Sequence, residues 1–249
     1  LLGFLDRLIE DFADEWLTKA MFHYRWHYAE DAAHAGPLLA FWQDLQLDSD
    51  RAQQSSQAFA ERQISRLYVV GSNDITAPVI ESSYERLVGI MDRIVQRRGF
   101  VMGSRPGASD FAVYGQLTQL VWVDPTPAKY AAKHSLRLRA WLDRMDDLSG
   151  HRDTEWLSAA EIQDHLGELL REVGRVYAPF LIANAQAVVK GQTDFETRID
   201  GQKWAQPVFP YQAKCLETLR NAYAKLAPNV QQNLGDILRG TGCEILFKF

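Results

Sequence analysis

The sequence is poor in cysteine and lacks any cluster of basic residues. Its 249 residues include only two cysteines, Cys215 and Cys243, which lie far apart and outside any CxxC motif. Such a pair predicts neither a disulfide framework nor a zinc site, and it fits a reducing compartment. The net charge is −5, whereas sequence-independent nucleic-acid binding needs clustered Lys and Arg. We therefore expect a cytoplasmic protein with no nucleic-acid partner.

Long apolar runs are also missing. The longest nearly apolar run, Tyr177 to Val189, is interrupted by one proline and two amides and is too short to cross a bilayer. The first twelve residues reach an acid at Asp6 and contain neither a basic region nor a cleavage site, so they do not resemble a signal peptide. We expect no membrane partner.

Helical periodicity dominates what is present. Apolar residues recur at steps of three and four near the start of the chain: Leu5, Ile9, Phe12, Trp16 and Ala20. This spacing predicts an amphipathic helix that begins at or before Phe4 and continues into His23 and His27. A natural chain rarely opens inside such a helix without a capping residue. Either the helix frays at a true terminus or a preceding segment is not part of these residues.

The same reasoning predicts further helices along the whole chain. A break at Gly36 separates the first helix from a short one that Pro37 begins. Leu136, Trp141, Leu142 and Met145 should form the inner face of the helix over 128–148. A kink is expected at Pro179, where a backbone donor is missing. The expected helices after the first are 37–45, 51–69, 78–98, 108–121, 128–148, 159–190, 211–226 and 228–238.

One segment has a β pattern. Two short runs flank Asp200-Gly201, a dipeptide suited to a tight hairpin turn, so we expect a hairpin near 194–207. No internal repeat or low-complexity segment occurs. The predicted architecture is an all-α bundle with one small β-hairpin.

Two stretches carry a resemblance to a known family. "GFVMGSRPGASDFAVYGQL", Gly99 to Leu117, followed by "SLRLRAWLDRM", resembles the helical C-terminal domain of the glutathione transferase superfamily. The family pattern has a glycine, a proline, a capping residue and an aspartate that opens a buried helix, and Trp141 matches its later aromatic-centred helix. The resemblance covers roughly Leu5 to Leu148. It implies a glutathione transferase C-terminal-like helical domain over 1–150 and a helical extension over 151–249.

Asp110 has a physical role that is independent of the resemblance. At the third position of a helix, a carboxylate can reach back to free backbone N–H groups and meet the positive end of the helix dipole. The family usually has Ser or Thr at the capping position, where this chain has Gly107. Half of the reciprocal capping box is therefore missing, and Ser109 is expected to substitute in part.

The resemblance also implies a function and its limits. Members of the family conjugate glutathione to apolar electrophiles, commonly as dimers, and their thioredoxin-like domain binds glutathione and activates it. These 249 residues show no βαβ pattern and no suitable N-terminal nucleophile. We therefore expect no catalytic residue here, an apolar small-molecule electrophile as ligand, a homodimer, and glutathione as co-substrate. The protein would be a transferase only if a thioredoxin-like domain precedes this chain in the full protein.

The stretch "FHYRWHYAEDAAH" contains half of the six histidines and admits three interpretations. His23 and His27 lie one helical turn apart, but two imidazoles do not complete a four-ligand site, so we expect no metal. A solvated or core-edge helix face is the second interpretation. The third is a pocket wall, because in the family this helix flanks the crevice that holds the electrophile. It makes His23, Tyr24 and His27 substrate-binding candidates, with Trp122 as a weaker one.

Two further features are candidate sites. The acids Glu10, Asp11, Asp14 and Glu15 resemble a paired-carboxylate site, but acids near a helix start are favoured by the helix dipole, and we expect a solvated face. Cys215 is expected to be a small buried apolar side chain. The alternative to a transferase part is a non-catalytic helical binding or assembly module with the same fold, and a metal-binding helical protein is a third interpretation.

Overall fold

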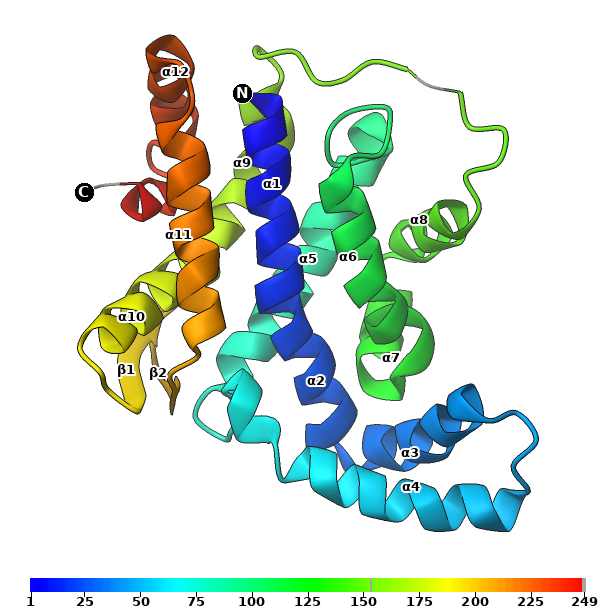
Figure 1. The fold of residues 1–249 in the computed structure, drawn as a ribbon. Coiled ribbons are helices and arrows are strands. Elements are labelled where there is room, and N and C mark those ends of the chain that lie inside the picture. The colour runs from blue at the N-terminus through cyan, green and yellow to red at the C-terminus, as the bar shows by residue number, and fades with distance from the viewer. Residues whose placement is uncertain (153, 248–249) are drawn as a thin grey trace.

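The computed structural model describes residues 1–152 and 154–247, and helices make up most of it (Figure 1). The prediction of a helical protein with one small hairpin is confirmed, while the glutathione transferase-like arrangement of the helices remains a prediction. The α-helices are α1 (Leu2–Phe12), α2 (Thr18–His27), α3 (Ala29–Gln43), α4 (Ser49–Ile64), α5 (Ala77–Arg98), α6 (Ala108–Thr118), α7 (Pro125–His134), α8 (Leu136–Asp146), α9 (Ile162–Glu172), α10 (Ala178–Val189), α11 (Pro210–Ala224) and α12 (Pro228–Leu238). The shorter elements are the π turns η1 (Ala13–Leu17), η3 (Gln119–Val123) and η4 (Val173–Tyr177), the 3₁₀ turns η2 (Leu67–Val70) and η5 (Cys243–Leu246), and the strands β1 (Asp194–Ile199) and β2 (Gln202–Pro207).

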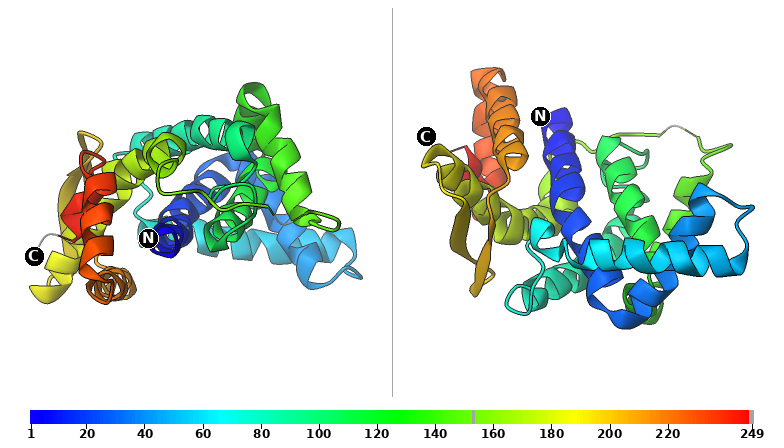
Figure 2. Two further views of the ribbon diagram at one scale, coloured as in Figure 1. Left: turned by 90° about the horizontal axis from the view of Figure 1, so that it is seen from above. Right: turned by 60° about the horizontal axis from the view of Figure 1, so that its bottom comes forward.

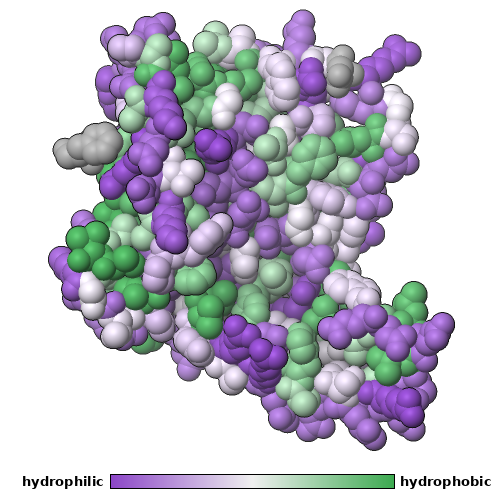
Figure 3. Space-filling view, in the orientation of Figure 1, coloured by the Kyte–Doolittle hydropathy of each residue, from purple (hydrophilic) through white to green (hydrophobic). Residues whose placement is uncertain are grey.

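Helix α1 lies between the two halves of the molecule. It packs against α6 on one side and α11 on the other, as the front view and the view from above both show (Figures 1 and 2). Helices α3 and α4 pack on each other and project as an arm, whose surface mixes hydrophilic and hydrophobic side chains (Figure 3). Across residues 1–152 and 154–247, no helix combines the length and apolar character needed to cross a membrane.

One hydrophobic core runs through both halves. Trp16 of η1 packs edge-on against Phe180 of α10 and also contacts Trp204 of β2, with ring centroids 5.8 and 5.3 Å apart. All three side chains are buried in the same cluster as Leu87 of α5. The expected boundary near residue 150 stays a prediction, and the apolar packing is continuous across it.

The predicted first helix is confirmed, with one addition. The helical path begins at Leu2 and continues to His27, but residues 13–17 form the π turn η1. A π turn widens the helix locally and such turns occur often at functional sites. A π turn also interrupts the helix predicted over 159–190. Helices α9 and α10 are joined there by η4, which ends two residues before Pro179, the position where a kink is expected.

The break predicted at Gly36 and Pro37 is wrong. The chain leaves helical geometry at Tyr28 instead, and α3 then continues from Ala29 through Pro37. Gly36 lies against α4, where a Cβ atom would come within 3.2 Å of the Ser56 side chain. Close packing of the two helices therefore maintains α3 through its proline, which local sequence reasoning could not foresee.

The helix predicted over 128–148 is also wrong, because it is two helices. The chain is extended at Ser135, whose hydroxyl caps α8 by accepting a hydrogen bond from the Leu138 amide at 3.0 Å. Trp141, Leu142 and Met145 are buried as predicted, whereas Leu136, the first residue of α8, is 74 % exposed. The helix predicted over 51–69 ends earlier too, at Ile64, and the 3₁₀ turn η2 follows it.

The hairpin prediction is confirmed in its turn as well as its strands. Asp194 pairs with Pro207 and Ile199 with Gln202, so two residues, Asp200 and Gly201, make the turn. Both have positive φ, 50° and 75°. A two-residue turn of this kind requires positive φ at both positions, which Asp-Gly tolerates better than most dipeptides.

Candidate functional site

His23 is the centre of a buried polar cluster at the end of α2. Its side chain is fully buried, with Nδ1 2.7 Å from the Ser72 hydroxyl and Nε2 3.1 Å from Glu81 Oε1. Tyr28 donates a hydrogen bond to the same carboxylate oxygen at 2.6 Å. Because a carboxylate can only accept, Nε2 carries a proton, and in the neutral ring Nδ1 accepts from Ser72. The hydrogen bond from His23 is the main reason that the pKa of Glu81 is lowered.

His27 extends this cluster to the surface. Its exposed ring stacks on His23 with centroids 4.6 Å apart and contacts the edge of Tyr28 at 5.2 Å. Partial burial, followed by the neighbouring His23, lowers the pKa of His27. His27 is therefore held largely neutral near pH 7, as a hydrogen-bonding group rather than a fixed charge.

Tyr24 lies behind the histidines, in the core. Its ring stacks on Tyr28 at 5.8 Å and meets the edge of Tyr84 at 5.3 Å, and only 5 % of the residue is exposed. Burial raises the pKa of Tyr24 above its ordinary range. The structure thus brings together three of the predicted residues, His23, Tyr24 and His27, of which only His27 is exposed.

Trp122 has a different set of neighbours. It lies in η3, with its ring 6.2 Å from Tyr114 of α6 and the Arg139 guanidinium of α8 5.2 Å from its ring centroid. Its indole N–H is buried without a hydrogen-bond partner among the described residues. The ring contacts of Trp122 do not include the His23 cluster.

Asp110 makes the predicted capping contacts. It is fully buried and accepts hydrogen bonds from the Gly107 amide at 2.9 Å and the Val101 amide at 2.8 Å. Ser109 does not supply the missing half of the cap, because its buried hydroxyl has no partner among the described residues. Asp6 of α1 supplies it instead, accepting from the amides of Ala108 at 3.2 Å and Ser109 at 2.9 Å.

The Ser72, His23 and Glu81 side chains have the order of a hydrolase triad but not its surroundings. Ser72 is only 4 % exposed. Its own amide donates to Leu67 O at 3.0 Å, and the Asn73 amide donates to the Thr76 hydroxyl at 3.0 Å. A nucleophilic serine needs an approach for substrate and free N–H groups for the developing oxyanion. This cluster therefore supports positioning and hydrogen bonding, not acyl transfer.

Sequence reasoning missed the partners that complete the cluster. Ser72 and Glu81 are separated from His23 by 49 and 58 residues, so no local spacing could identify them. Tyr28 carried a usable signal, because Tyr24 and Tyr28 are four residues apart on a predicted helix, where side chains meet. A buried ion pair on the other face of α2 was also missed, between Arg25 Nε and Asp124 Oδ1 at 2.9 Å.

Neither cysteine is suited to thiol chemistry. Cys215 and Cys243 are both unpaired and buried, as predicted for Cys215, and burial raises the pKa of each to about 12. A thiol with such a pKa is almost wholly protonated at neutral pH, and the thiolate is the nucleophile. Among residues 1–152 and 154–247, no group of three His, Cys, Asp or Glu side chains is placed to hold a metal ion.

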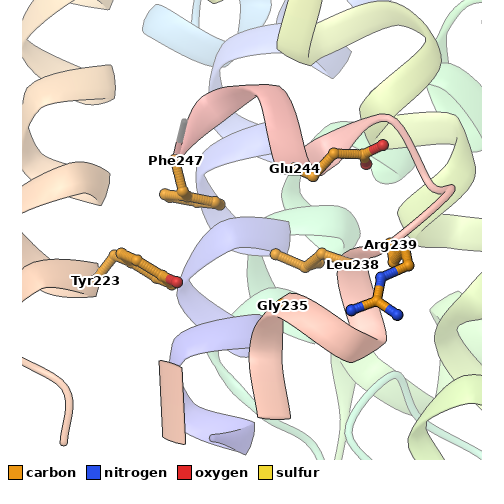
Figure 4. A pocket seen from close by; sticks show the side chains of 6 residues that line it. All are labelled: Tyr223, Gly235, Leu238, Arg239, Glu244 and Phe247. Carbon is orange, nitrogen blue, oxygen red and sulfur yellow. The ribbon is translucent and has the colours of Figure 1, made fainter. Parts of the chain in front are cut away.

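A cavity of about 290 Å³ lies near the C-terminus (Figure 4). Its aromatic wall is Tyr223 stacked on Phe247 at 4.8 Å. The polar groups at its rim are already engaged, since Arg239 bonds Asp236 at 2.8 Å and Glu244 accepts from the Gly242 amide at 2.8 Å. The cavity therefore offers an apolar surface and little polar recognition.

Comparisons with protein-family models, with curated proteins and with solved structures find no match to this chain.

Proposed function

We propose that this chain is the helical, electrophile-binding part of a glutathione S-transferase-like protein. The observation that carries the proposal is the arrangement around Asp110. A fully buried aspartate caps α6, a helix in contact with α1, after the Gly-Pro loop that the resemblance expects. That arrangement supports the family resemblance of residues 5–148, and the function follows from the resemblance.

In this proposal the exposed edge of the His23 cluster contacts the electrophile. His27 and Tyr28 present aromatic surface with a polar tip, which suits an apolar molecule that carries one polar group. His23 and Tyr24 position these two rings from behind, through stacking at 4.6 and 5.8 Å. Trp122 is a second, separate apolar contact in the same proposal.

The reaction proposed is attack of a glutathione thiolate on the electrophile, which forms a carbon–sulfur bond and releases the leaving group. Glutathione would be bound and activated by a thioredoxin-like domain outside these 249 residues. Ser72 is buried, and Cys215 and Cys243 are protonated, so this chain contributes shape and contacts rather than a nucleophile. A homodimer is part of the same proposal.

A non-catalytic binding or assembly module is the second candidate. It is favoured by the hydrogen bonding of His23, because both ring nitrogens already form hydrogen bonds with protein groups, Ser72 and Glu81. A residue whose polar atoms are fully engaged in the fold has little left to offer a ligand.

The first experiment compares the mass of the polypeptide isolated from its own cells with 28.3 kDa, and assays that native polypeptide with glutathione and 1-chloro-2,4-dinitrobenzene. We expect a larger mass, glutathione-dependent conjugation and a dimer in sedimentation.

In the full-length protein, His27→Ala should raise the KM for the electrophile about fivefold and leave the KM for glutathione unchanged. His134→Ala, an exposed histidine of α7 that stacks on Tyr130, is the matched control. A mass near 28.3 kDa with no response to glutathione would overturn the transferase proposal in favour of the binding module.

A further inference from the structure

A second cavity, of about 280 Å³, is lined by residues of η1, the start of α2, η2 and the start of α11. This size is near the lower end of the range for small-molecule sites. Its walls come from three segments far apart in sequence, so the cavity exists only in the folded chain. The lining residues are Asp14, Glu15, Thr18, Lys19, Val69, Val70, Phe209, Tyr211 and Gln212.

The cavity lining includes one buried acceptor without a partner, from Gln212, and a carboxylate with spare acceptor capacity, from Glu15. Gln212 is 97 % buried, since only 3 % of it is exposed. Its Nε2 donates to Glu15 Oε2 at 3.0 Å. Because a carboxylate only accepts, the amide nitrogen must face Glu15, and this leaves Gln212 Oε1, which has no hydrogen-bond partner among the described residues. The Glu15 carboxylate keeps spare acceptor capacity after this one bond.

The prediction of a solvated acidic face holds for Asp14, which is exposed, whereas Glu10, Asp11 and Glu15 are partly buried. Burial raises the pKa of Glu15 and of Asp14, and it raises the pKa of Asp11, beside them, to about 6. The π turn η1 carries Asp14 and Glu15. Partly buried carboxylates next to an unpartnered amide oxygen favour a ligand that brings hydrogen-bond donors and positive charge.

Among the described residues that line this cavity, Lys19 has the one cationic side chain, and its amine is already engaged. Its Nζ donates to Val70 O at 3.2 Å and Gln206 Oε1 at 3.3 Å, and it lies 4.2 Å from the centroid of the Phe180 ring. Burial lowers the pKa of Lys19 to about 7, so at pH 8 the amine is mostly neutral. It therefore neither offers a strong anion site nor strongly repels a cation above pH 7.

Two exposed aromatic rings line the same cavity. Phe209 is 39 % exposed and Tyr211 is 57 % exposed, with ring centroids 6.2 Å apart. Aromatic faces attract ammonium groups by cation–π interaction, and they also cover apolar carbon. Val69 and Val70 add aliphatic surface to the same lining.

We propose that this cavity binds a small organic cation, a primary ammonium with a short apolar tail. The ammonium donates hydrogen bonds to Gln212 Oε1 and the Glu15 carboxylate. The tail packs against the side chains of Val69 and Val70 and the rings of Phe209 and Tyr211. This site does not depend on the proposed transferase function.

The test is calorimetric titration of the chain at pH 8 with three probes of equal length: n-butylammonium, n-butanol and butyrate. We expect saturable binding of n-butylammonium and at least tenfold weaker binding of the other two. Glu15→Gln keeps the side-chain shape and removes one charge, and it should weaken n-butylammonium binding at least fivefold. Glu10→Gln removes the same charge from the neighbouring α1 outside the cavity lining, and it should change binding less than twofold.

Tyr211→Leu provides a second variant whose side chain is exposed enough to spare the fold, and it should weaken binding about threefold. Melting curves confirm that each variant is folded. The proposal is overturned if n-butylammonium shows no saturable binding at millimolar concentration, if n-butanol binds equally well, or if Glu10→Gln weakens binding as much as Glu15→Gln.

Discussion

At the scale of single residues, burial and hydrogen-bond partners give similar side chains different chemistry. His23 and His27 belong to one helical stripe, yet His23 is fully buried between Ser72 and Glu81, whereas His27 is exposed and has a lowered pKa. The same contrast separates Lys19, which is 2 % exposed, from the solvated lysines of the chain. Residue type alone would have assigned these pairs equal roles.

The shared cap of α6 gives the first prediction. Gly107 lets Asp6 approach, because a Cβ atom at position 107 would lie 2.7 Å from Asp6 Oδ1. Asp6→Ala should cost about 1–2 kcal/mol of unfolding free energy through the lost cap. Gly107→Ser should also destabilise the protein, because its Cβ atom collides with both Asp6 and Met102. The double variant should lose less stability than the two single losses add up to, since the introduced serine caps the helix and only Met102 Cγ, 2.8 Å from the new Cβ atom, still has to move.

Urea denaturation of the four proteins measures this coupling. If the losses of the two single variants simply add in the double variant, the serine does not replace Asp6 as the cap of α6, and the two positions act independently.

Lys19 gives a pH-dependent prediction. Its pKa is lowered from 10.5 to about 7 because burial disfavours the charged amine. Below pH 7 the amine is protonated in both states, and the folded state bears the full cost of burying the charge. Between about pH 7 and 10.5 the unfolded chain binds the proton and the folded chain does not, so this cost declines as pH rises.

Lys19→Met should therefore stabilise the protein at pH 6 by roughly 2–5 kcal/mol, and the gain should shrink toward pH 10. Chemical denaturation at both pH values measures the difference. Lys203→Met, at a lysine whose side chain is 54 % exposed, is the control and should show no such trend. An equal gain at pH 6 and pH 10 would refute the lowered pKa.

At the scale of elements, packing between helices decides where several helices begin and end. Helix α3 passes through Pro37 although the local rule predicts a break there, and α8 begins after the extended residue Ser135 although the hydrophobic pattern continues across that residue. The hairpin differs, because its Asp-Gly turn imposes positive φ locally. The residues of a turn therefore predict its backbone conformation, whereas the continuity of a helix depends on the helices that pack against it.

Pro37 lies inside α3, so its missing N–H leaves the carbonyl of Ala33 without its helical donor. Pro37→Ala should restore this bond and stabilise the protein by about 1–3 kcal/mol, with slower amide exchange in α3. Pro228→Ala, in the first turn of α12, is the control and should be nearly neutral because an N–H there has no helical partner. Faster exchange in α3 after Pro37→Ala would show that the proline supports the helix instead.

At the scale of the whole molecule, the extension after residue 150 shares one core with the helices before it. Trp204 of the hairpin is fully buried against Trp16 and Phe180. A polar chain crosses the same interface, in which Trp16 donates to Ser83, Ser83 donates to Glu172, and Arg86 pairs with Glu172. We therefore expect the two halves to unfold together.

Trp204→Ala should destabilise the chain by about 3–5 kcal/mol, because it removes a large buried side chain from the shared core. Denaturation followed by circular dichroism should show a single transition that is shifted as a whole. Trp42→Ala, at a tryptophan that is 52 % exposed on the projecting arm, should change stability by less than about 0.5 kcal/mol. Two separate transitions, with the first half unaffected by Trp204→Ala, would contradict a common core.

The sequence by itself determined the helical class, the hairpin with its Asp-Gly turn, and the capping role of Asp110, because periodicity, turn geometry and helix capping are local. Only the tertiary structure decided that Asp6 completes the cap of α6, that Ser72 and Glu81 engage His23, and that Gln212 and Lys19 line one cavity with Glu15. These contacts join residues far apart in the chain. Their strength depends on the burial of polar side chains, which the hydrophobic pattern does not predict.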